Sequence, residues 1–422
     1  MTDYPKLFQI KQKFAPAATN NISERISSEI AGLKLSKRIG PGDKIAVTAG
    51  SRGITGIDSI TRTVIGELIK PGGKPFIIPA MGSHGGATAE GQLGVLAGHG
   101  ITEDKMGVPI ISSMEVVKVG ESKEGIPVYV DKNAVDADHV VVINRIKPHT
   151  RFSGKIESGL IKMLLVGLGK DVAAGIYHRA LMKYSFDRII DSVLPILLSR
   201  LPVLFGLAIV ENAYGGVANI KAINGADIID VEPMLKKESL ELMPKLPFKE
   251  IDLLIVDEMG KDISGTGMDT NIIGRKQGPA QTQDMDEEVR ITRIFVRDLT
   301  DKSCGNACGI GLADFTTRRL VKKINEKETN INCIAALRPE GAKVPMTFDC
   351  DKDAIDAAIS TCGMDDTKNI KIVRIKNTLD LNTLIASEAY LDDLENRDGL
   401  EQISPVRELV FDSSNNLESF NI

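Results

Sequence analysis

Short apolar runs rich in β-branched residues alternate with helix-like patterns along most of this 422-residue chain. In the first half, the strand-like runs occupy residues 44–48, 75–79 and 139–143, and the helix-like patterns occupy residues 58–70 and 88–97. The helical spacing at 88–97 begins with Thr88, a residue that commonly caps helices. Strands that alternate with helices favour a mostly parallel sheet covered by helices, so we predict an α/β fold.

The chain is longer than one hydrophobic core usually organises, which favours two domains. We expect the boundary near residues 240–250, with domains at 1–245 and 246–400 and a tail at 401–422 that could pack back on the first domain. Because ligand sites are common between domains, the active site is expected in the interdomain cleft. The second alternation runs through residues 251–256, 292–296, 313–324, 331–337 and 371–375.

Charge and hydropathy exclude several functional classes. The net charge of -5 comes from 57 acidic and 52 basic residues without a basic stripe, which disfavours nucleic-acid binding. The N-terminus lacks a cationic segment before an apolar run, and polar residues interrupt the apolar stretch 193–210. We therefore expect a soluble, cytoplasmic protein without a membrane partner. Cys304 and Cys308 lack a second closely spaced pair, so structural thiols are favoured over a zinc site.

Polar residues follow three of the predicted strands directly. Arg52 comes after the run at 44–48, His84 after 75–79 and His149 after 139–143. The carboxyl ends of parallel strands form one edge of a sheet, where ligands bind in open α/β folds. The three side chains are therefore predicted to line one site.

The glycine-rich segments do not match nucleotide fingerprints. Neither the dinucleotide pattern nor the P-loop pattern occurs, and Gly167-Leu168-Gly169-Lys170 lacks a third glycine. An ordinary NAD or ATP site is therefore disfavoured.

Histidine and lysine carry the chemistry that these positions suggest. His84 and His149 could exchange a hydroxyl proton from two sides of a substrate, although two histidines bonded to backbone carbonyls remain an alternative. Lys162 follows Ser158 in an apolar, helix-like stretch that would favour the neutral, nucleophilic amine, while a lysine snorkelling from an amphipathic helix remains the alternative. His99 and His139, at a helix exit and a strand start, are interpreted as structural.

These segments resemble the nickel-dependent lactate racemase family, whose members racemise or epimerise 2-hydroxy acids with a nickel-pincer nucleotide. The family has an S-G-x-x-K segment followed sixteen residues later by a histidine, as in Ser158 to Lys162 and His178. Its two acid/base histidines match Gly82-Ser83-His84 and Pro148-His149, and its T-R-P segment aligns with the residues from Thr48 to Gly53.

The resemblance implies roles for individual residues. Lys162 would bond the cofactor covalently and His178 would bind nickel. His84 and His149 would be the catalytic acid and base, and Arg52 would bind the substrate carboxylate with Lys261 as a second contact. The implied enzyme is an isomerase that removes and returns a hydride at C2, with a small 2-hydroxy acid and the cofactor-synthesis enzymes as partners and a homo-oligomer left open.

Departures from the family pattern make lactate itself doubtful. Ala49 replaces an aspartate, Gly53 replaces a proline, the chain has no tryptophan, and the stretch from His149 to Lys162 is three residues longer than in the lactate enzymes. Arg151 and Lys155 add polar groups in that stretch. We therefore favour a sugar acid such as gluconate, with lactate or another short 2-hydroxy acid as the alternative.

Two further hypotheses remain open. One is a zinc hydrolase with His84, His149 and His178 as ligands, and the other is a non-catalytic carrier of the nickel nucleotide. A carrier would need no proton-exchanging histidines. The sequence assigns no role to Lys155, Glu157 or the glycine-rich loop at 264–269.

Overall fold

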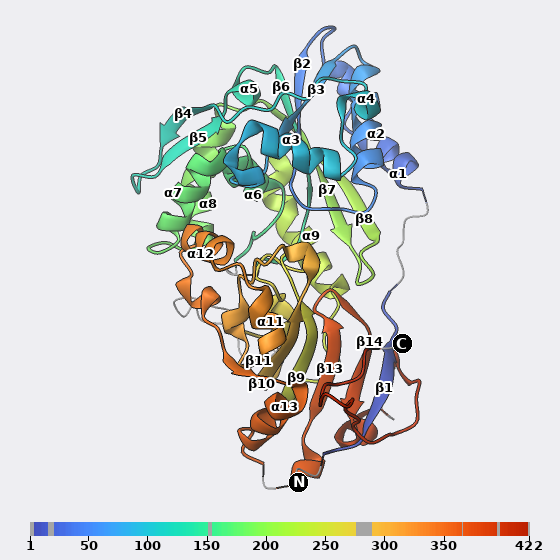
Figure 1. The fold of residues 1–422 in the computed structure, drawn as a ribbon. Coiled ribbons are helices and arrows are strands. Elements are labelled where there is room, and N and C mark those ends of the chain that lie inside the picture. Colours follow the sequence, from blue (N-terminus) through green and yellow to red (C-terminus); the bar gives the residue numbers. More distant parts are fainter. Residues whose placement is uncertain are drawn as a thin grey trace. The chain divides into compact units, whose positions relative to one another are not determined.

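The computed structural model describes residues 4–15, 21–150, 154–275, 289–364, 366–394 and 397–420. The chain forms two compact units (Figure 1). The first unit is Ala15–Met243, and the second unit combines Met1–Phe14 with Pro244–Ile422.

The first unit is built on a sheet with the strand order β3-β2-β6-β7-β8. Neighbouring strands are parallel except for the pair β7 and β8. The strands are β2 (Lys44–Ala49), β3 (Lys74–Pro79), β6 (His139–Arg145), β7 (Val203–Glu211) and β8 (Val217–Asn224), and the separate pair is β4 (Val116–Glu121) with β5 (Pro127–Asp131). The helices are α1 (Ile22–Ala31), α2 (Ile57–Ile69), α3 (Ala89–Gly98), α4 (Glu103–Met106), α5 (Lys132–Val135), α6 (Leu160–Lys162), α7 (Lys170–Ala180), α8 (Phe186–Leu198) and α9 (Ile228–Leu242).

Both faces of this sheet are buried. On β2, Ile45 and Val47 belong to one apolar cluster and Ala46 belongs to another, because successive side chains of a strand point to opposite faces. A strand covered on both faces is apolar at nearly every position, which is why the strand runs were recognisable in the sequence. The cap at Thr88 also forms as predicted, since its hydroxyl accepts the Gly91 N–H at 3.0 Å.

The second unit contains a mixed sheet in the order β12-β11-β10-β9-β13-β14-β1-β15. The pairs β12-β11, β11-β10, β10-β9 and β9-β13 are parallel, whereas the pairs β13-β14, β14-β1 and β1-β15 are antiparallel. The strands are β1 (Leu7–Gln12), β9 (Glu250–Met259), β10 (Arg290–Leu299), β11 (Phe315–Thr317), β12 (Met346–Phe348), β13 (Ile372–Asn377), β14 (Asp380–Ser387) and β15 (Leu400–Gln402). The helices are α10 (Thr270–Ile273), α11 (Arg318–Lys323), α12 (Glu326–Ala335), α13 (Asp351–Ser360) and α14 (Leu391–Leu394). The prediction of an α/β fold with mostly parallel sheets is confirmed.

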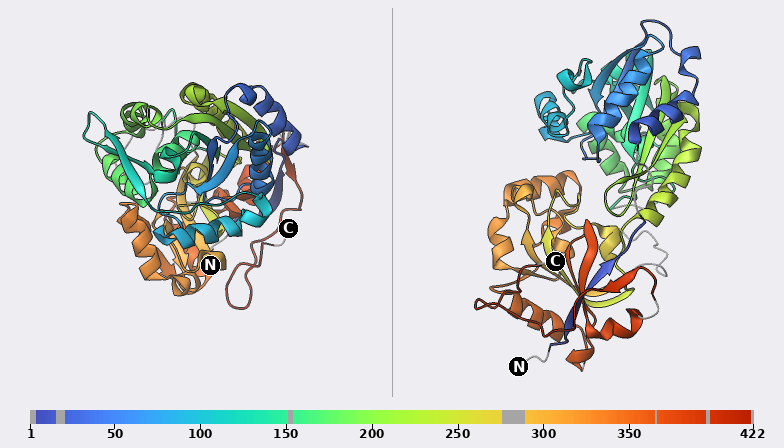
Figure 2. Two further views of the ribbon diagram at one scale, coloured as in Figure 1. Left: turned by 90° about the horizontal axis from the view of Figure 1, so that it is seen from above. Right: turned by 90° about the vertical axis from the view of Figure 1, so that its right-hand side faces the viewer.

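The two ends of the chain lie in the second unit, unlike the division expected from the sequence. From the sequence, residues 1–245 are expected to form one domain, but β1 lies in the second unit, where it pairs with β14 and β15 (Figure 2). Phe8 and Ile10 of β1 are buried. The tail at 401–422 was expected to pack on the first domain. Its Arg407 instead bridges to Leu7 of the second unit. A strand joins the sheet that supplies its hydrogen-bond partners, and sequence neighbourhood does not reveal that sheet.

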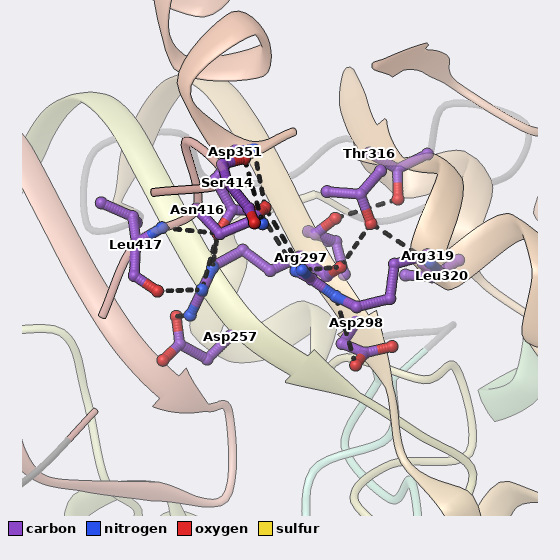
Figure 3. Close-up of polar contacts among 12 residues, drawn as sticks. Asp257, Arg297, Asp298, Thr316, Arg319, Leu320, Asp351, Ser414, Asn416 and Leu417 are labelled. Atoms are coloured by element: carbon purple, nitrogen blue, oxygen red, sulfur yellow. Dashed lines mark hydrogen bonds and ion pairs between the residues drawn. The ribbon is translucent and has the colours of Figure 1, made fainter. Parts of the chain in front are cut away.

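A buried ionic network holds the tail against the second sheet (Figure 3). Arg297 pairs with Asp257 at 2.9 Å and with the fully buried Asp351 at 2.6 Å. Arg374 makes a two-pronged contact with Asp257. The Leu417 N–H donates to Asp351 at 3.0 Å, and the Leu417 carbonyl accepts from Arg297 at 2.9 Å. Hydrogen bonds from the charged side chains of Arg297 and Asp351 to the Leu417 backbone therefore fix the path of the tail.

In the part of the chain that the structure describes, the helices are all too short or too polar to traverse a bilayer.

Candidate functional site

The first three strands of the parallel sheet end at one edge. The chain passes from β2 to β3 on one side and then returns to β6 on the other side of β2. The reversal of strand order beside β2 is the place where open α/β sheets bind ligands. Ala49 pairs with Pro79 at the ends of β2 and β3, and the segments with Arg52, His84 and His149 follow from this edge.

A hydrogen bond from His99 holds the Arg52 segment. The Nε2 atom of His99 donates to the Ser51 carbonyl at 3.0 Å, since a carbonyl oxygen can only accept. Desolvation lowers the pKa of the Arg52 guanidinium, and the positive charge of Arg145 lowers it further. Arg145 itself pairs with Glu211. The Arg52 guanidinium is therefore close enough to Arg145 for the two positive charges to interact.

The imidazole of His84 is oriented by its own turn. Its Nδ1 atom donates to the Met81 carbonyl at 2.8 Å, and the side-chain amide of the buried Gln92 donates to the carbonyls of Gly82 and His84. In the neutral ring, an Nδ1–H donor leaves Nε2 without a proton. His84 is exposed at this point, so Nε2 has the form required of a base.

The His149 segment is a loop closed at its base. The Lys147 N–H donates to the Ser158 carbonyl at 2.8 Å, and the His149 N–H donates to the buried carboxylate of Glu157 at 2.6 Å. Glu157 also pairs with Lys236 of α9 at 2.5 Å. Glu157 thus fixes the backbone next to a half-buried imidazole, and Arg151, noted in the sequence, lies outside the described residues.

Lys162 ends the short helix α6. Its neighbours Ile161 and Met163 are buried while Lys162 is half-buried, in agreement with the apolar surroundings expected from the sequence. The N-cap residue of α6 is Gly159, which has no side chain to cap the helix, and Glu232 of α9 accepts the Ile161 N–H at 3.0 Å instead. A π-helical turn, Met163–Gly167, follows directly, and such turns are frequent at functional sites.

Three contacts join the lysine segment to all three strand ends. The Thr48 hydroxyl lies 2.9 Å from the Met163 sulfur. The Asn144 amide donates to the Gly159 carbonyl at 2.7 Å. The Gly82 N–H donates to the Gly167 carbonyl at 3.3 Å. The structure therefore brings the backbone segments of Arg52, His84, His149 and Lys162 to one edge of the first sheet.

The Gly-Leu-Gly-Lys stretch belongs to the packing of this edge. A Cβ atom on Gly167 would lie 2.6 Å from the Ala80 carbonyl oxygen, so glycine permits the close approach of the π-helical turn to the end of β3. Lys170 is fully buried, pairs with Asp131 at 2.8 Å and donates to the Pro79 carbonyl. The lysine of this stretch therefore links β3 to α7.

The remaining predicted residues are His178 and Lys261. His178 is half-buried in the last turn of α7, the helix that Lys170 starts. Lys261 lies in the second unit, where its ammonium donates to the Gly265 carbonyl at 2.8 Å and to Asn332 Oδ1 at 2.7 Å. These bonds anchor Lys261 to the glycine-rich loop at 264–269.

Metal-ligating side chains do not cluster in the part of the chain described. No group of three or more His, Cys, Asp or Glu side chains is placed to hold a metal ion among these residues. His84, His149 and His178 all belong to them, so the zinc-hydrolase hypothesis gains no support. Cys308 is buried 3.4 Å from the sulfur of Cys333, whereas Cys304 is exposed.

Glu232 should make stability depend on pH. It is buried, and desolvation raises the pKa of its carboxyl from 4.5 to about 7 against the opposing effect of two backbone N–H donors. Between these values the folded chain binds more protons than the unfolded chain, so the free energy of unfolding falls as pH rises. We expect Glu232→Gln to gain about 2–3 kcal/mol relative to wild type between pH 5 and 8 in urea unfolding. Glu241→Gln, an exposed position of the same helix, should show no such divergence.

Comparisons with known proteins agree with this architecture. Residues 7–187 match the family model of the lactate racemase N-terminal domain. A crystal structure of a protein from Thermotoga maritima is 14% identical, with a TM-score of 0.50, over 82% of this chain and 92% of that chain. The lactate racemase apoprotein from Thermoanaerobacterium thermosaccharolyticum is 13% identical, with a TM-score of 0.45, over 81% of this chain and 94% of that chain. No curated protein matches the chain.

The fold is α/β, and the match to the lactate racemase N-terminal domain supports racemase or isomerase activity. The match to the lactate racemase N-terminal domain covers residues 7–187, and it confirms the resemblance drawn from the sequence over this range. The range includes Arg52, His84, His149, Lys162 and His178, whereas Lys261 lies beyond it.

Sequence reasoning missed the residues that hold the site in place. In the sequence Lys170 belongs to an incomplete nucleotide fingerprint, and no local pattern marks Asp131 or Lys236. Glu157 was left without a role. A charged residue within an otherwise apolar stretch was the available signal for Lys170, since a lysine there must find a buried partner.

Proposed function

We propose that this chain is a racemase or epimerase that inverts C2 of a 2-hydroxy acid with a nickel-pincer nucleotide. The observation that carries the proposal is the convergence of the Arg52, His84, His149 and Lys162 segments at one edge of a sheet within the matched family domain. These four side chains supply a cation, two imidazoles and an amine, which are the groups that the reaction requires.

The chemistry explains why an acceptor for hydrogen is needed. The C2 hydrogen of a hydroxy acid is scarcely acidic, and the substrate has no amino group through which a Schiff base could stabilise a carbanion. Removal of that hydrogen as hydride, with loss of the hydroxyl proton to a base, gives a planar keto acid that can be reduced from either face. When bound, the nickel nucleotide supplies the acceptor for this hydrogen.

The donor set fits such a cofactor. Lys162 offers an amine for a covalent bond, and His178 offers one imidazole, which suits a metal whose other donors come with an organic ligand. Lys162 is half-buried between the buried side chains of Ile161 and Met163. Lys162 and His178 are therefore the residues that would hold the group.

The remaining residues act on the substrate. Arg52 would hold the carboxylate by a two-pronged contact, and the carboxylate would in turn offset the repulsion between Arg52 and Arg145. His84 would accept the hydroxyl proton at Nε2, because Nδ1 is committed to the Met81 carbonyl. His149 would do the same for the opposite enantiomer, with its backbone held by Glu157. Lys261 is proposed as a second carboxylate contact.

A sugar acid such as gluconate is the proposed substrate, ahead of lactate. The chain lacks tryptophan, and Gly53 stands where the family has proline. The longer stretch between His149 and Lys162 carries the exposed Lys155, which adds a donor for hydroxyl groups. A substrate site with fewer aromatic side chains and more hydrogen-bond donors favours a longer, hydroxylated acid.

One experiment tests the proposed function directly. The chain is produced with and without the enzymes that synthesise the cofactor, and intact mass and metal content are measured. We expect added mass that Lys162→Ala abolishes, together with about one nickel per chain in the loaded protein. Chromatography that resolves epimers, after incubation with gluconate, malate or lactate, then identifies the substrate. Zinc without added mass would contradict the proposal, and an adduct without turnover of any hydroxy acid would favour a carrier.

A further inference from the structure

We propose that helix α9 positions two parts of the candidate site, Lys162 through Glu232 and His149 through Lys236 and Glu157. Glu232 and Lys236 are four residues apart, a spacing at which opposite charges on a helix commonly pair with each other. Here each reaches toward a different segment. The roles of Lys162 and His149 rest on the proposed function, whereas the contacts are properties of the structure.

Glu232 completes a helix that cannot cap itself. Glu232 is 1% exposed, and its Oε2 atom accepts the Ile161 N–H at 3.0 Å. A side chain on Gly159 would place its Cβ atom 2.2 Å from Glu232 Oε1, so the glycine and the glutamate fit each other. The carboxyl therefore supplies the acceptor that Ser, Asp or Asn would otherwise provide at the N-cap, the position of Gly159. The direction of α6, and with it the start of the Lys162 side chain, depends on this contact.

Lys236 neutralises the carboxylate of Glu157, which holds the backbone of His149. Its ammonium lies 2.5 Å from Glu157 Oε1 and donates to the Gly154 carbonyl at 2.5 Å. Glu157 is 4% exposed, and its carboxylate accepts the N–H groups of His149 at 2.6 Å and Gly154 at 3.2 Å. Without Lys236 the carboxylate would be a buried charge without its cation. The loop that carries His149 would then lose its fixed geometry.

The two contacts make α9 a common support. Glu232 and Lys236 lie one turn apart on the same helix face. The Lys162 helix and the His149 loop are therefore both held by contacts with α9. Substrate and anchored group must be held within a fraction of an ångström for efficient reaction. The spacing between Glu232 and Lys236 on α9 therefore helps to set the distance between Lys162, which would anchor the cofactor, and His149, the acid/base residue.

Hydrogen exchange of the full chain without cofactor tests the contacts. Lys236→Met should speed exchange of the His149 amide by about 10–100-fold and leave the Ile161 amide unchanged, as expected for loss of a hydrogen bond to a charged group. Glu232→Ala should speed exchange of the Ile161 amide and leave the His149 amide unchanged. Glu232→Gln retains an acceptor and should restore protection of the Ile161 amide. Lys237→Met, at an exposed position of the same helix, is the matched control. Lys236→Gln replaces Lys236→Met if that variant loses protection throughout the chain.

The loaded protein provides the second readout. Lys236→Met should lower kcat more than it changes KM while the mass on Lys162 stays unchanged, Lys236→Arg should restore most of kcat, and Glu232→Ala should slow adduct formation on Lys162. A wild-type adduct together with a Lys236→Met variant that behaves like Lys237→Met would overturn this inference alone. Absence of an adduct in the wild type would overturn the proposed function itself.

Discussion

Replacement of Lys170 by Met is expected to destabilise the chain by about 3–5 kcal/mol, because it leaves the carboxylate of Asp131 buried without its partner. Both side chains of this pair have no solvent exposure, and their atoms lie 2.8 Å apart. The lysine also donates to the Pro79 carbonyl, which loses a donor in the variant. Urea unfolding of the full chain, with hydrogen exchange assigning the loss to the first unit, measures the effect.

Two further variants separate charge from packing. Lys170→Met combined with Asp131→Asn removes both charges and should recover part of the loss, since the penalty comes from the unpaired ion. Lys132→Met is the matched control, because Lys132 pairs with Glu115 at 3.6 Å on the surface and should change stability by less than about 1 kcal/mol. Equal stability of Lys170→Met and Lys132→Met would show that the buried pair is dispensable.

Replacement of His84 or His149 by Ala is expected to lower kcat by roughly 10²–10⁴-fold in the loaded enzyme, because each removes a proton-transfer group. The two variants should retain the adduct on Lys162, since neither histidine bonds the cofactor in the proposed function. Epimer-resolving chromatography measures turnover, and intact mass measures the adduct.

The chain provides its own histidine control. His139 lies at the start of β6, at the end of the strand opposite to the site, where it pairs with Asp43 at 3.1 Å. His139→Ala should therefore keep its turnover. His99 is unsuitable as a control, because it supports the Arg52 segment through the Ser51 carbonyl. Unchanged turnover of both His84→Ala and His149→Ala would remove these residues from the mechanism.

Local sequence was enough to locate the segments that carry the candidate residues. A strand buried on both faces is apolar throughout, so the ends of β2, β3 and β6 could be located and the residues that follow them could be chosen. The carboxyl ends of parallel strands lie at one edge of a sheet, so the segments that follow β2, β3 and β6 start from the same edge. The chemical roles of these residues remain predictions.

The sequence by itself determined the alternation of strands and helices, the α/β class and the polar residues at the strand ends, because each depends on near neighbours in the chain. Only the tertiary structure decided that β1 joins the second unit, that Lys170 pairs with Asp131, and that Glu232 and Lys236 of α9 support the segments of Lys162 and His149. These contacts join residues from about 40 to nearly 400 positions apart. Their partners are chosen by burial, since a buried charge or backbone donor must be satisfied by whichever group the fold brings near, and no local pattern records that group.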